Sequence, residues 1–137
     1  MRPLLFLFPL LLAGCVNDSA SYYIDGNDHT LTLRAEQDRF WEKMVTLRLI
    51  TARLPDCQRQ VELGRVPQDG LDVELLANGD NIYTLRAGEQ AWQVDAQNCT
   101  PLAAPQQPGG QPVGAFRFSG DKLVFVPAAT VAADAGQ

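Results

Sequence analysis

The sequence is poor in the side chains that most often do catalytic chemistry. Among its 137 residues there is one histidine, His29, and there are three cysteines. No serine lies in a nucleophile-elbow motif, so a Ser-His-Asp triad has no basis. A reactive thiol or a thiolate metal site needs a free cysteine and a nearby base, and a single histidine gives such a site little support. We therefore expect that the protein is not an enzyme and has no catalytic residue, metal or cofactor.

Positive charge and phosphate-binding motifs are also scarce. The 11 Lys and Arg residues are outnumbered by 16 Asp and Glu residues, and the formal net charge is −5. This excess of acid argues against nucleic acid as a partner and against electrostatic binding to anionic lipid headgroups. There is no glycine-rich phosphate loop. A glycosidase with two catalytic carboxylates stays open as an enzymatic alternative, because the separation of carboxylates in space cannot be read from the sequence.

One segment has acidic and amide residues at the spacing of a calcium loop. Asp25, Asn27, His29 and Glu36 fall at the first, third, fifth and twelfth places of an EF-hand loop. The sixth place is Thr30, where the sharp turn of such a loop needs glycine, and histidine is a poor ligand for a hard cation. The spacing therefore does not predict a calcium site.

Long apolar runs are absent except at the start, where Leu4 to Leu12 follow Met1-Arg2. This run is too short to cross a bilayer of about 30 Å as a permanent helix. A charged start, an apolar run and small residues after it are the layout of a secretory signal. The run ends at the tetrad Leu12-Ala13-Gly14-Cys15.

This tetrad resembles the lipobox of bacterial lipoprotein precursors at all four positions. The resemblance implies that residues 1–14 are a signal peptide, that Cys15 becomes the N-terminus, and that Cys15 is acylated on sulfur and nitrogen. Several acyl chains on one residue anchor a protein stably to a membrane. In such lipoproteins an Asp after the cysteine tends to retain the protein in the inner membrane, so Val16 implies the outer membrane of a Gram-negative envelope. An ordinary signal peptide, or a buried strand with a chance cysteine, is the alternative.

The two remaining cysteines are predicted to form a disulfide. Cys57 and Cys99 would lie in an oxidising compartment, where two otherwise unpaired thiols in one small domain usually pair. The loop between them is long enough for the cross-link to stabilise the fold by a few kcal/mol.

The rest of the chain has the composition of one small domain. Residues 15–28 are mostly small and polar and are predicted to form a flexible tether. Residues 29–127 are predicted to form a single β domain, within which residues 100–113 form a loop rich in proline and glycine. Residues 128–137 are predicted to be a disordered tail.

Apolar residues alternate with polar ones along most of this domain, which is the period of a half-buried strand. The pattern predicts strands at residues 30–35, 43–54, 57–63, 71–76, 82–86, 90–95, 115–119 and 122–126. We predict an all-β fold, a small antiparallel β-sandwich or partly open barrel of about seven short strands. The main alternative is an α+β fold with one short helix near residues 36–46, because Phe40, Trp41, Met44 and Val45 also fit helical spacing.

Turn residues fix the expected register of two hairpins. Gly88-Glu89 and Gly120-Asp121 are each predicted to be a two-residue loop. Both loops would bring large apolar residues face to face. The expected pairs are Leu85 with Trp92, Tyr83 with Val94, Phe118 with Leu123, and Phe116 with Phe125.

Whether the loop around Gly79 has an odd or an even number of residues can be predicted from the sequence. Leu71, Val73 and Leu75 share the core face of the next hairpin only if the connecting loop has an odd number of residues. We therefore predict a loop of three or five residues there, not a plain two-residue Asn-Gly turn.

Two polar groupings are predicted to be structural. Pro55-Asp56-Cys57-Gln58-Arg59 is the densest local cluster, and we expect a turn in which Arg59 pairs with Asp56, in preference to a binding site. Asp69, Asp72 and Glu74 are expected on the solvent face of a strand.

Two functions are compatible with these features. The first is a non-enzymatic, lipid-anchored envelope lipoprotein that faces the periplasm and binds another envelope protein as an accessory module. The second is a module that binds a small ligand or glycan, or an inhibitor of a wall-degrading enzyme. A protein-binding module should present an unpaired sheet edge or a flat apolar patch, whereas a ligand-binding module should have a concave pocket lined by Trp92 or Trp41.

Overall fold

The computed structural model describes residues 17–39, 41–106 and 109–128. These residues form ten strands and no helix. The strands are β1 (Asn17–Asp25), β2 (His29–Glu36), β3 (Met44–Arg53), β4 (Cys57–Pro67), β5 (Asp72–Ala77), β6 (Ile82–Ala87), β7 (Gln90–Asp95), β8 (Thr100–Leu102), β9 (Gln111–Ser119) and β10 (Lys122–Pro127).

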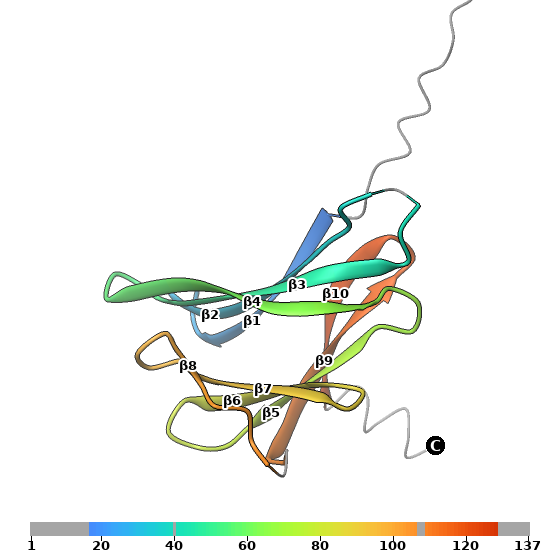
Figure 1. Cartoon of the computed structure of the whole chain (residues 1–137). Coiled ribbons are helices and arrows are strands. Elements are labelled where there is room, and N and C mark those ends of the chain that lie inside the picture. The colour runs from blue at the N-terminus through green and yellow to red at the C-terminus, as the bar shows by residue number, and fades with distance from the viewer. Residues whose placement is uncertain (1–16, 40, 107–108, 129–137) are drawn as a thin grey trace, which may run out of the picture.

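The strands form two antiparallel sheets that pack face to face as a sandwich (Figure 1). The four-stranded sheet has the order β1-β2-β3-β4, and the six-stranded sheet has the order β10-β9-β5-β6-β7-β8. The predicted all-β sandwich is therefore confirmed. The two sheets do not close into a barrel. The core between the sheets consists of alternate residues of the central strands. Its fully buried members include Leu31, Leu33, Leu47, Leu49, Val73, Leu75, Leu85 and Phe116.

The predicted alternative with a helix near residues 36–46 is wrong. The described residues there form the end of β2, an irregular loop and the start of β3. Val45 is buried as the first core residue of β3, whereas Trp41 is 62% exposed in the loop. The apolar residues of this stretch therefore do not share one helical face, and the period of two decides the structure.

The predicted tether at residues 15–28 is also wrong, because Asn17–Asp25 form strand β1. In the register of β1 with β2, Ala20 faces Leu33 and Tyr22 faces Leu31, so both pack against the core. The hydroxyl groups of Ser21 and Thr32 are hydrogen-bonded at 2.6 Å on the other face. One face of β1 has small and aromatic residues and the other is rich in serine. The sequence of such a strand resembles that of a polar linker.

The loop rich in proline and glycine is shorter than predicted. Strand β8 occupies residues 100–102 and strand β9 begins at Gln111, so the connection covers residues 103–110. Pro101 is tolerated in β8 because this is the edge of the sheet, where a missing N–H breaks no ladder bond on the solvent side. The connection is attached to the six-stranded sheet by Asn78, whose Nδ2 donates to the carbonyl oxygen of Gly109 at 2.7 Å.

The predicted hairpin registers are confirmed. Ala77 pairs with Tyr83, which leaves residues 78–82 between them, an odd number as the parity of the core faces requires. The other confirmed pairs are Leu85 with Trp92, Tyr83 with Val94, Phe118 with Leu123, and Phe116 with Phe125.

The predicted disulfide is confirmed as well. It joins Cys57, at the start of β4, to Cys99, in the connection between β7 and β8, with the two Cα atoms 6.0 Å apart. The bond therefore links the two sheets at one end of the sandwich. Residues 1–14, Cys15 and residues 129–137 lie outside the described part of the chain. Within the described part, no helix is long and apolar enough to cross a membrane.

Candidate functional site

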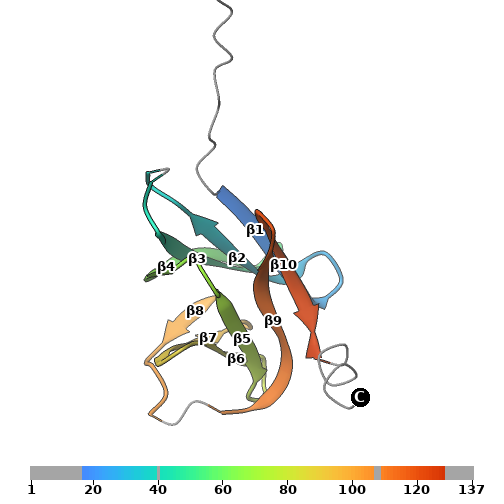
Figure 2. The same ribbon diagram turned by 90° about the vertical axis from the view of Figure 1, so that its right-hand side faces the viewer.

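The two long sides of the sandwich differ, as Figure 2 shows. We call the side where β1 lies beside β10 the closed side, and the side with β4 and β8 the open side. On the closed side the carboxylate of Asp18 accepts a hydrogen bond from the backbone N–H of Leu123 at 2.8 Å. On the open side β4 and β8 are the outer strands of their sheets.

Strand β4 presents a long free edge. It has 11 residues, and within the described chain it is hydrogen-bonded to β3 alone. By contrast, β8 has three residues and includes Pro101. Free edges are prone to pair with other strands, and proteins limit this with charges and bulges. In β4 a bulge at Leu63-Gly64 shifts the register, so that Leu47 pairs with Gly64 and Arg48 pairs with Glu62.

A small apolar cavity lies between this edge and the opposite sheet. We call it the Trp92 slot; its volume is about 70 Å³. It is lined by Leu49, Val61, Glu62, Leu63, Trp92, Gln93, Val94, Pro101 and Leu102. Pockets for small molecules have volumes of roughly 300–1,000 Å³. The slot is therefore too small for a ligand of that size, and its volume is on the scale of one aliphatic side chain.

Arg59 lies two residues before Val61 of the slot, and it has no ionic partner among the residues that the structure describes. In the β3–β4 register Arg59 faces Thr51 and Val61 faces Leu49, and both of these β3 residues are buried, so Arg59 and Val61 point to the inner face of the sheet. The predicted pair of Arg59 with Asp56 is wrong. Asp56 accepts instead from Arg53 at 2.7 Å, because the short turn folds Asp56 back toward Arg53, to whose carbonyl oxygen its N–H donates.

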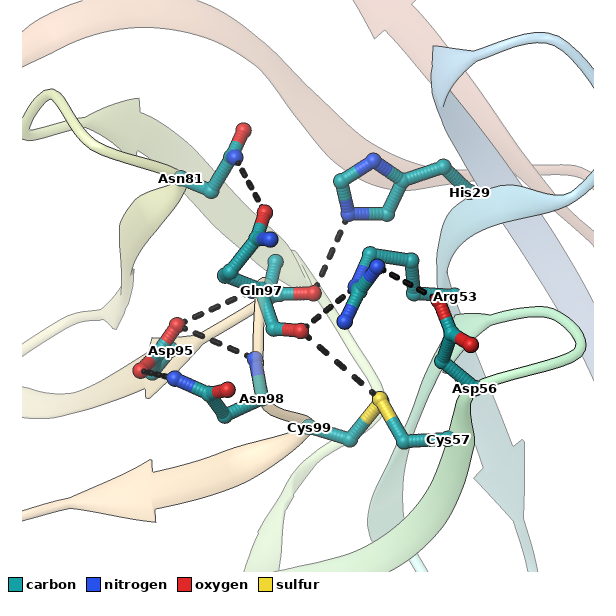
Figure 3. Close-up of polar contacts among 10 residues, drawn as sticks. His29, Arg53, Asp56, Cys57, Asn81, Asp95, Gln97, Asn98 and Cys99 are labelled. Carbon is teal, nitrogen blue, oxygen red and sulfur yellow. Dashed lines mark hydrogen bonds and ion pairs between the residues drawn. A yellow bond between two sulfur atoms is a disulfide. The ribbon is translucent and has the colours of Figure 1, made fainter.

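A polar cluster occupies the disulfide end of the sandwich (Figure 3). His29 Nε2 lies 3.1 Å from the carbonyl oxygen of Ala96, and Arg53 Nε donates to the carbonyl oxygen of Gln97 at 2.6 Å. Asn81 Nδ2 donates to Oε1 of Gln97 at 2.9 Å. The contacts of His29 and Arg53 join β2 and β3 to the connection after β7, so they hold the two sheets together.

Asp95 organises the turn that follows β7. Its carboxylate accepts hydrogen bonds from the side chain and backbone of Asn98 and from the backbone of Gln97. These bonds, of which the one from the Asn98 side chain has the largest effect, hold the pKa of the Asp95 carboxyl below its usual range. The cause is stabilisation of the ionised form by the donors around it. The cluster therefore positions Cys99 for the disulfide.

The residues with calcium-loop spacing do not converge. Asp25 ends β1 and Asn27 lies in the turn before β2, whereas Glu36 ends β2 and forms ion pairs with Arg34 and Arg48. Within residues 17–39, 41–106 and 109–128, no group of three His, Cys, Asp or Glu residues is arranged to hold a metal ion.

The acidic residues of the six-stranded sheet form ion pairs on its outer face. Asp72 pairs with Arg117 at 3.2 Å, and Glu74 pairs with Arg86. The predicted position on the solvent face of a strand is confirmed for Asp72 and Glu74, whose carboxylates are exposed. It is wrong for Asp69, which lies in the turn between β4 and β5.

A concave pocket lined by Trp92 or Trp41 was the feature expected of a module that binds a small ligand. Trp92 lines the small slot, whereas Trp41 lies under the guanidinium of Arg39, 5.7 Å from the ring centre. Sequence reasoning did not single out Val61, Leu63 or Leu102 as site residues. The available signal was the pair of apolar residues at 61 and 63 in the otherwise polar stretch 58–65. No family model, curated protein or solved structure matched the chain.

Proposed function

We propose that this protein is a non-enzymatic lipoprotein of the outer membrane of a Gram-negative envelope. The tetrad Leu12-Ala13-Gly14-Cys15 and the apolar run before it support the anchor, with Cys15 as the acylated residue. The β domain then faces the periplasm and serves as an accessory module that binds another envelope protein.

The free edge of β4 supports this function best. An extended segment of a partner can join such an edge as an additional strand, with main-chain hydrogen bonds for affinity and a side-chain pocket for selectivity. The 11-residue edge and the adjacent Trp92 slot supply both elements. A partner can reach this part of β4, since Gln58, Arg59 and Gln60 are all exposed.

Binding of a small polar ligand or glycan is the alternative, and one observation favours it. An open hollow near the disulfide end is lined by Ile24, Asp25, Asp28, His29, Arg53, Leu54, Asn81 and Gln97. The polar groups of His29, Arg53, Asn81 and Gln97 already bind one another or the backbone. A ligand would have to replace these bonds, so the free edge is the better supported site.

Photo-crosslinking in intact cells tests the proposal. The full-length protein is given a photoreactive amino acid at Gln60 on β4, and a matched version has it at Lys122 on β10. We expect Gln60 to capture one envelope protein reproducibly and Lys122 not to capture it. A Cys15→Ser version should lose both the anchor and the captured protein. Equal capture from both positions, or capture from neither, would contradict binding at the β4 edge.

A further inference from the structure

We propose that the segment bound by β4 has an aliphatic residue and a carboxylate two positions apart. The aliphatic side chain enters the Trp92 slot, and the carboxylate pairs with Arg59. This inference rests on the proposed addition of a strand to β4, and it names the chemistry of that strand.

The spacing follows from the geometry of the edge. Side chains on one face of a strand recur at every second residue, and residues directly opposite each other on neighbouring strands point to the same face. Arg59 and Val61 share the inner face of the four-stranded sheet. A residue opposite Val61 therefore points into the Trp92 slot, and the residue two positions away on the incoming strand lies opposite Arg59.

The lining of the slot defines the first of these residues. Val61 and Leu63 from β4, Trp92 from β7 and Leu102 from β8 present apolar atoms around about 70 Å³. A single Val, Leu or Ile side chain matches this space and chemistry. Because the slot lies between the outer strands of the two sheets, the entering side chain would contact both sheets at once.

The charge of Arg59 defines the second residue. Six of the arginines in the described chain form ion pairs with carboxylates, and these are Arg34, Arg48, Arg53, Arg65, Arg86 and Arg117. Arg39 lies over Trp41. Arg59 has neither kind of contact within the described residues, although it is next to the free edge. A carboxylate is the complement of a guanidinium and can accept two parallel hydrogen bonds from it.

A second copy of this chain fits the site less well. If two β4 strands paired about a two-fold axis with their inner faces together, Arg59 would need a carboxylate on the inner face of β4. The one carboxylate of this strand is Glu62, which faces Arg48 on the outer face. The observations therefore favour a different protein with an acidic and apolar segment.

Selection of displayed peptides tests the inference with the full-length protein held in detergent micelles. Random ten-residue peptides on phage are selected against the native protein and against Arg59→Glu. We expect native selection to enrich Asp or Glu two positions from Val, Leu or Ile, and Arg59→Glu to enrich Lys or Arg at that position. A peptide from the native selection should bind Arg59→Glu about tenfold more weakly, since an ionic attraction becomes a repulsion.

Two control variants separate the inference from the proposed function. Gln60→Glu places the same charge on the adjacent residue of β4, on the outer face, and should change peptide affinity by less than about threefold. Val61→Lys places a charge at the slot and should abolish binding, while its thermal unfolding shows whether the fold is kept. Arg59→Gln, which removes an exposed charge, provides a second test with little effect on folding.

The outcomes are distinguishable. Enriched peptides that need Val61 but show no acidic preference, or that keep the same preference with Arg59→Glu, would overturn the inference and leave strand addition in place. Peptides that bind Val61→Lys as well as the native protein, or a selection without enrichment, would overturn both.

Discussion

The closed side and the open side of the sandwich are built from different contacts. On the closed side, Tyr22 lies between Tyr83 and Phe125, with ring centroids 6.0 and 5.2 Å apart, and Phe116 lies 5.1 Å from Phe125. These rings come from both sheets and fill the space between β1 and β10. The open side is joined by one disulfide at its end, and beside it lies the small Trp92 slot.

The difference shows how a sandwich can leave one edge free without losing its core. Packed aromatic rings contribute large buried areas, so the closed side stabilises the fold without backbone pairing between β1 and β10. Gly114 permits this packing, because a Cβ at that position would overlap the Phe125 ring and the carbonyl oxygen of Val126. The fold therefore does not need the edge of β4 to pair with another strand of the chain.

Truncation of the closed side should have the largest effect. Phe116→Ala removes a ring that is fully buried against Phe125 and should lower the free energy of unfolding by about 3–5 kcal/mol. Phe118→Ala is the matched control, because Phe118 is on the same face of β9 but only partly buried. Urea unfolding of both variants measures the difference. Equal losses would show that the complete burial of Phe116 adds nothing to the stability of the fold.

Removal of the disulfide should have the next largest effect, on the open side. The bond closes a loop with a sequence separation of 42, and its loss should lower the free energy of unfolding by about 2–4 kcal/mol. The variant is Cys57→Ser with Cys99→Ser, measured by guanidinium unfolding against the native protein. A loss larger than that of Phe116→Ala would reverse the proposed ranking of the two sides.

Much of the fold was predictable because short-range rules dominate its hairpins. Two-residue turns at Gly88-Glu89 and Gly120-Asp121 fix register, and the period of two assigns each face. Strand β1 was missed because its outer face is serine-rich and its inner face includes a small alanine. Strand β8 was missed because Pro101 indicated a loop, although proline is acceptable in a strand at the edge of a sheet.

The candidate site was less predictable than the fold. Trp92 was named from the sequence only as one of two tryptophans that would line the pocket of a ligand-binding module. The role of Val61 and Leu63 depends on which strand of each sheet is left without a neighbour. That order depends on pairing between distant segments, such as β5 with β9. Alternation in one segment does not specify these partners, so the free edge of β4 could not be derived from local pattern.

The closed side should also make stability sensitive to alkaline pH, with a smaller effect. Burial, together with the neighbouring Tyr22, raises the pKa of Tyr83 above that of an exposed tyrosine. When the pH rises past the pKa of the unfolded chain, the unfolded tyrosine loses its proton while the folded one keeps it, so the free energy of unfolding falls with pH. The stabilisation is complete below that pH and is lost by the time the pH passes the raised pKa of the folded state.

Tyr83→Phe should reduce this decline, and Tyr23→Phe, at an exposed tyrosine of β1, should leave it unchanged. Urea unfolding at a series of pH values above 9 measures both variants against the native protein, and an identical decline in Tyr83→Phe would show that another group causes it.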